Sequence, residues 1–60
     1  MLPQDPVILL SYINTQLRDN YGNLEALTDG LGLSSEGLQD ICDKLKAVGY
    51  VYDDTQNKFI

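Results

Sequence analysis

The chain has 60 residues, with nine acidic and four basic side chains, a net charge of −5 and no histidine. A chain of this length makes one domain (1–60) with a small core, because it buries only about 60% of the surface that its unfolded form exposes. The acidic balance disfavours binding to phosphate backbones and anionic membrane surfaces. Without histidine, neither a Ser-His-Asp nor a Cys-His catalytic arrangement can form.

Cysteine content and hydropathy indicate the compartment. Cys42 is the only cysteine, which rules out a disulfide framework and is typical of a reducing compartment. The longest apolar run, Val7–Leu10, is far too short to span a bilayer. It also lacks the basic flank and the small-residue cleavage site of a signal peptide. We therefore expect a cytoplasmic protein that does not bind membranes.

A first helix is predicted over residues 6–20. Asp5 is a good N-cap, and Pro6 is tolerated at the first helical position, where its missing N–H would be unbonded anyway. Gly22 is expected to end the helix. Apolar residues recur at helical spacing and form one stripe: Leu10, Ile13, Leu17 and Tyr21, widened by Ile8 and Leu9.

Two further helices are predicted, joined by a tight Gly-Leu-Ser turn at 32–34. Asn23 caps the shorter helix, in which Leu24, Leu27 and Leu31 share a face. Two short helices joined in this way indicate a helix-turn-helix. Ser34 caps the longer helix, and Gly49 supplies the left-handed residue that commonly follows a helix. The apolar face of this longer helix comprises Leu38, Ile41, Cys42, Leu45 and Val48.

A hairpin is predicted at the C-terminal end. Residues 50–52 and 58–60 favour strands, and Asp53, Asp54 and Asn57 favour the turn between them. The pattern leaves the register open, and with it the residues that point inward. The predicted fold class is therefore mainly α with a small β-hairpin. It consists of a three-helix helix-turn-helix core followed by a C-terminal two-stranded wing, a minimal winged-helix-like outline.

Two segments carry a family resemblance: DPVILLSYINTQLRD at residues 5–19, and the ending LKAVGYVYD…NKFI. On these motifs the chain resembles a family of bacterial proteins of about this length that is catalogued only as a domain of unknown function. The resemblance covers essentially the whole chain and implies a bacterial, intracellular, stand-alone small protein. It implies no activity, cofactor or binding residues.

Groups that could support catalysis or metal binding have simpler explanations. Cys42 lies on the apolar helix face, where a cysteine behaves as a small inert hydrophobe. Asp53, Thr55 and Asn57 alternate like the start of a calcium loop, but Lys58 stands where that loop requires glycine, and no glutamate follows at its twelfth position. We therefore expect no enzymatic activity, no cofactor, no metal site and no small-molecule ligand.

The favoured function is protein binding by a non-enzymatic module, including self-association. Its candidate site is a polar edge of the first helix at helical spacing: Ser11, Asn14, Thr15 and Arg18. A structural alternative stays open for two of these residues. Arg18 would then pair with Asp53, Asp54 or the terminal carboxylate, and Asn14 would hold hairpin backbone.

The alternative function is DNA binding by a winged helix-turn-helix. If the third helix entered a major groove, Ser35, Gln39 and Lys44 would be its contact residues. The same helix carries Glu36, Asp40 and Asp43, and these carboxylates oppose phosphates, so charge disfavours this alternative.

Overall fold

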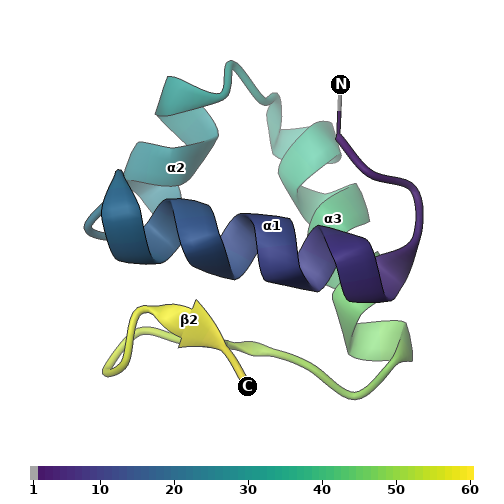
Figure 1. Cartoon of the computed structure of the whole chain (residues 1–60). Coiled ribbons are helices and arrows are strands. Elements are labelled where there is room, and N and C mark those ends of the chain that lie inside the picture. Colours follow the sequence, from purple (N-terminus) through teal and green to yellow (C-terminus); the bar gives the residue numbers. More distant parts are fainter. Residues whose placement is uncertain (1) are drawn as a thin grey trace.

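Helix α1 (Pro6–Asp19) begins at the predicted residue in the computed structural model, which describes residues 2–60 (Figure 1). Asp5 Oδ1 accepts hydrogen bonds from the backbone N–H groups of Val7 (2.9 Å) and Ile8 (3.3 Å). The helix ends at Asp19, one residue before the predicted end, and Tyr21, which was predicted to continue its apolar stripe, lies outside it. Tyr21 is nevertheless half-buried against the core.

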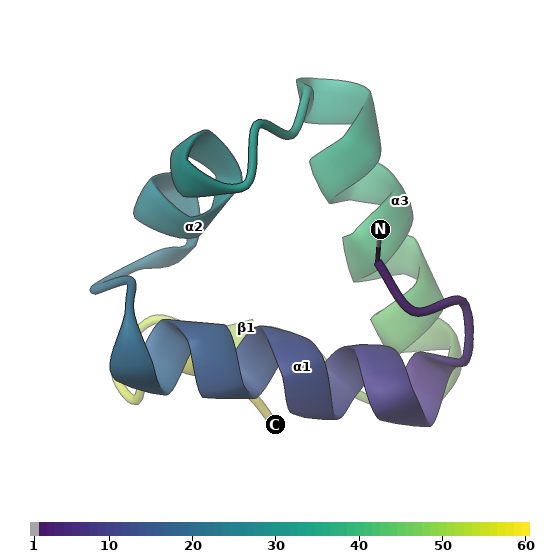
Figure 2. The same ribbon diagram turned by 45° about the horizontal axis from the view of Figure 1, so that its top comes forward.

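Helices α2 (Leu24–Gly30) and α3 (Ser35–Ala47) begin at the predicted caps. Asn23 Oδ1 accepts from the N–H of Ala26 at 2.7 Å, and Ser34 Oγ accepts from the N–H of Gly37 at 3.1 Å. After α3, Gly49 adopts the predicted left-handed conformation with a φ of 92°. In Figure 2, α1, α2 and α3 form the sides of a triangle.

Within residues 2–60, seven buried side chains from the helices and the hairpin form the core: Leu9, Ile13, Leu17, Leu27, Ile41, Leu45 and Phe59. Two predicted core positions are wrong, because Ile8 is 58% exposed and Val48 is 43% exposed. The buried stripe of α1 runs through Leu9, Ile13 and Leu17, so it begins at Leu9 instead of Leu10, and Ile8 faces outward. Val48 follows the last residue of α3, so it no longer shares that helix's apolar face.

The hairpin consists of β1 (Tyr52–Asp53) and β2 (Lys58–Phe59), paired antiparallel with Tyr52 opposite Phe59. Both strands are shorter than predicted. Strand β1 cannot begin at Tyr50, because the Tyr50 N–H donates to the Leu45 carbonyl (2.9 Å) at the end of α3. The register places Tyr52 and Phe59 on the inner side, with ring centroids 5.6 Å apart, and leaves Val51 exposed.

The predicted fold class is confirmed: in the described part of the chain, three helices are followed by a C-terminal antiparallel hairpin, and the structure is mainly α. Strand β2 lies beside α1, and the hairpin closes the core below that helix (Figure 1). Within residues 2–60, no helix is both long enough and apolar enough to cross a membrane.

Replacing Leu45 with alanine is expected to unfold the protein or nearly so. Leu45 is fully buried, and such a truncation costs about 2–5 kcal/mol, whereas a domain of this size has roughly 3–9 kcal/mol of stability. Gln39→Ala on the same helix should leave the stability almost unchanged, because Gln39 is exposed. Urea denaturation followed by circular dichroism measures both variants. Equal urea midpoints for the two variants would contradict the assignment of Leu45 to the buried face of α3 and of Gln39 to its exposed face.

Candidate functional site

Asn14 connects α1 to the hairpin through both ends of its side-chain amide. Its Oδ1 accepts from the Phe59 N–H at 2.8 Å, and its Nδ2 donates to the Phe59 carbonyl at 3.1 Å. These two backbone groups point away from β1, because Tyr52 and Phe59 form a non-hydrogen-bonded pair of the ladder. Asn14 therefore pairs with β2 as a third strand would, as its structural alternative predicted.

Asn57 makes a second connection between the hairpin and α1. Its Nδ2 lies 3.1 Å from the Leu17 carbonyl and 3.0 Å from the Tyr21 carbonyl, at the end of α1. Its Oδ1 accepts from the Tyr52 hydroxyl at 2.7 Å. The residue has a φ of 55°, a conformation that asparagine tolerates better than most residues. The predicted turn residue thus also satisfies carbonyls that the helix end leaves open.

Arg18 does not pair with the hairpin, so that part of the structural alternative is wrong. Its Nε and Nη2 donate to the two carboxylate oxygens of the adjacent Asp19, each at 2.8 Å. The hydrogen bond to Arg18 lowers the pKa of Asp19, and the hydrogen bond to Asp19 raises the pKa of Arg18. Both side chains are exposed, so this pair adds little to stability.

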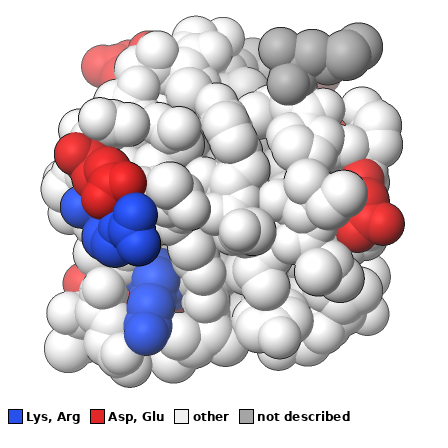
Figure 3. Space-filling model, viewed as in Figure 1, with Lys and Arg blue, Asp and Glu red and all other residues white. Residues whose placement is uncertain are grey.

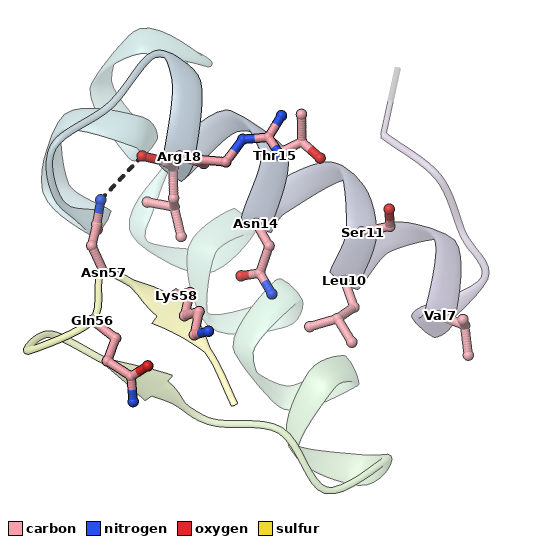
Figure 4. Close-up of a pocket in the computed structure, with 10 residues that line it drawn as sticks. Val7, Leu10, Ser11, Asn14, Thr15, Arg18, Gln56, Asn57 and Lys58 are labelled. Atoms are coloured by element: carbon pink, nitrogen blue, oxygen red, sulfur yellow. Dashed lines mark hydrogen bonds between the residues drawn. The ribbon is translucent and has the colours of Figure 1, made fainter.

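An open groove of about 780 Å³ runs between α1 and the hairpin (Figure 4). The four predicted partner-binding residues, Ser11, Asn14, Thr15 and Arg18, all line it. Figure 4 shows Asn14 directed toward the hairpin, with Ser11 and Thr15 along the exposed side of α1. Six further lining residues were not predicted as site residues: Val7, Leu10, Leu17, Gln56, Asn57 and Lys58.

The charge distribution of the groove differs from that of the whole chain. Its lining contains two of the four basic residues, Arg18 and Lys58, and none of the nine acidic ones. Residues 6–17, most of α1, carry no charge at all. Figure 3 shows the side of the molecule on which α1 lies in Figure 1. This side is largely uncharged, and its charged side chains lie toward the edges.

We call the solvent-facing side of α1 its outer face, formed by Val7, Ile8, Ser11, Thr15 and Arg18, all of which are exposed. Val7 is 68% exposed and Ile8 is 58% exposed. A helix face in water normally carries charged residues, and exposed apolar side chains that lie together indicate an interaction surface. The uncharged run was visible in the sequence, but only the burial of Leu9 shows which side of it faces water.

The residues of the DNA-binding alternative lie along α3 and are engaged in different ways. Ser35 is exposed in the first turn. The Gln39 amide donates to Asp43 Oδ1 at 2.9 Å. Lys44 Nζ donates to Gln4 Oε1 at 3.1 Å and lies 3.9 Å from Asp40.

The residues considered for metal binding or catalysis, Asp53 and Cys42, have structural roles. Asp53 Oδ1 accepts from the Thr55 N–H at 2.9 Å, which forms a turn. Among residues 2–60, no three cysteine, aspartate or glutamate side chains gather closely enough to hold a metal ion. Cys42 is half-buried against the core, and this burial, with a smaller effect of Asp43, raises the pKa of its thiol.

These features define a small helical domain with a C-terminal hairpin and an open groove beside its first helix. The family described as "Domain of unknown function (DUF4250)" matches residues 3–59, and the chain belongs to this family. The family expected from the terminal motifs is thus confirmed. No curated protein and no solved structure matches the chain significantly.

Replacing Asn14 with alanine is expected to destabilise the fold. The change leaves the N–H and the carbonyl of the buried Phe59 without partners, at roughly 1–3 kcal/mol for each group. Asn20→Ala is the matched control, since the Asn20 side chain is exposed and, among residues 2–60, donates a hydrogen bond to the Gln16 side chain alone. Thermal unfolding compares the two variants, and a similar loss in both would show that the Asn14 contact contributes little.

Proposed function

We propose that the chain is a non-enzymatic protein-binding module of the cytoplasm, with the groove and the outer face of α1 as its binding surface. The observation that carries the proposal is the run of residues 6–17, which is uncharged although it includes four exposed residues, Val7, Ile8, Ser11 and Thr15. Interface centres are depleted of charged residues in the same way. The lone, half-buried cysteine agrees with a reducing compartment.

The groove suits a macromolecular partner better than a small molecule. It is open to solvent, and its lining includes Asn14, whose side-chain amide is already hydrogen-bonded to Phe59. Pockets for small ligands enclose most of the ligand and present unengaged polar groups that fix its orientation. An extended surface with apolar residues at one end and Arg18 and Lys58 at the other offers a protein several separate contacts.

DNA binding by α3 remains the second candidate, supported by the order of the elements alone. An outline shared with DNA-binding domains is a weak argument for function. The exposed residues of α3 include Glu36, Asp40 and Asp43, and Lys44 already contacts Gln4. Bringing these carboxylates to a phosphate-lined groove is electrostatically unfavourable.

A capture experiment tests the binding surface. The tagged chain is expected to retain a protein from an extract of its own cells, with or without nuclease treatment. Ser11→Glu should abolish capture because it places a charge in the groove, whereas Ser35→Glu, the same exposed substitution on α3, should not. Equal capture by both variants would contradict the proposed surface, and capture lost on nuclease treatment would favour nucleic acid.

A mobility-shift experiment tests the second candidate. The purified chain is expected to leave mixed-sequence duplex DNA unshifted at low salt, where electrostatic binding is strongest. Tight binding that weakens as salt is added would reverse the order of the two candidates. In that case Ser35→Glu should reduce binding and Ser11→Glu should not.

A further inference from the structure

A carboxylate lies just before the outer face of α1, and a guanidinium, already paired with Asp19, lies at its far end. Asp5 precedes the helix, Arg18 lies in its last turn, and both are exposed. No charged residue lies between them in the sequence. We infer that the partner on this surface is a second copy of the chain, with the two α1 helices packed antiparallel; this inference rests on the proposed function.

The charges at the two ends make the surface self-complementary. In a two-fold symmetric contact, if residue i of one copy meets residue j of the other, then j also meets i. With the axis beside Ser11, which lies near the midpoint of the two charges, each Asp5 faces the partner's Arg18. Asp19 uses only Nε and Nη2 of the guanidinium, which has five N–H donors in total, so Arg18 can bond a second carboxylate.

Electrostatic repulsion between two acidic copies should be weaker at this surface than at most other faces. Each copy has a net charge of −5, so contact between most other faces would bring carboxylates together, and such like-charge contacts are costly. The groove lining contains no carboxylate. Near the proposed axis, the small side chains of Ser11 and Thr15 allow the two helices to approach closely.

The hairpin can extend the contact area. Side chains alternate along a strand, so Ile60 lies on the same face of the hairpin as Lys58, which lines the groove. Val51 pairs with Ile60 through two backbone hydrogen bonds, and both are exposed apolar residues. A stable dimer buries about 800 Å² per partner, which is about a fifth of the 3974 Å² accessible on this chain. The outer face of α1 and the adjoining hairpin residues together form a surface for this contact.

Sedimentation equilibrium of the purified chain, from micromolar to millimolar concentration, tests the inference. The mass is expected to approach that of two chains as the concentration rises. Ser11→Glu should remain at the mass of one chain, because two new carboxylates would meet at the axis, while Ser35→Glu should behave as the parent does. Thr15→Glu serves as the second disrupting variant if Ser11→Glu does not fold, since Thr15 is exposed and makes no side-chain hydrogen bond within residues 2–60.

The antiparallel arrangement has its own test. Asp5→Asn keeps an N-cap, because asparagine caps as well as aspartate, and it reduces the net charge of each copy. Net charge alone would therefore tighten the dimer. The proposed pairing with Arg18 predicts instead that Kd rises by roughly 2- to 30-fold, the range for two exposed ion pairs. Adding Arg18→Gln to Asp5→Asn should weaken the dimer little further.

The outcomes separate the inference from the proposed function. A parent chain that stays monomeric at every concentration overturns the second-copy inference, as does a dimer that tolerates both Ser11→Glu and Thr15→Glu. An unchanged or lower Kd for Asp5→Asn overturns the antiparallel pairing. The proposed function fails separately, if capture from the extract does not depend on Ser11.

Discussion

The pairing between the Asn14 amide and the backbone of Phe59 is the contact on which the C-terminal part of the fold depends. An isolated two-stranded hairpin is marginal in water, and the strands here have only two residues each. Asn14 satisfies the two backbone groups that β2 cannot direct toward β1. This pairing allows Phe59 to be buried without leaving its N–H or carbonyl unbonded.

Helix α1 has three sides with different roles. Leu9, Ile13 and Leu17 face the core, and Asn14 holds the hairpin edge. The remaining side is the outer face, whose residues before Arg18 are uncharged although no contact within residues 2–60 covers them. In a chain this short, one helix serves as both the centre of the fold and the main element of the candidate binding surface. The other helices carry most of the acidic residues, and these side chains are exposed.

Local features of the sequence predicted the fold well. The caps at Asp5, Asn23 and Ser34, and the left-handed Gly49, depend only on neighbouring residues, and all four are found. The attachment of the hairpin to α1 was harder to predict, because Asn14 and Phe59, which form it, lie 45 residues apart. The pairing of Arg18 was predicted with carboxylates of the hairpin. Its actual partner, Asp19, is the next residue in the chain, and a pair of adjacent residues produces no helical spacing that could be recognised in the sequence. The contributions of Gln56 and Lys58 to the groove likewise depend on tertiary packing.

Amide hydrogen exchange at Phe59 tests most directly whether Asn14 completes the hairpin. The Phe59 N–H donates to Asn14, whereas the Tyr52 N–H, directly opposite in the ladder, points away from β2. We predict that Phe59 exchanges slowly, with the core amides of α1, and that Tyr52 exchanges much faster. Equally fast exchange at the two positions would contradict the account, since it would mean that the hairpin opens independently of α1.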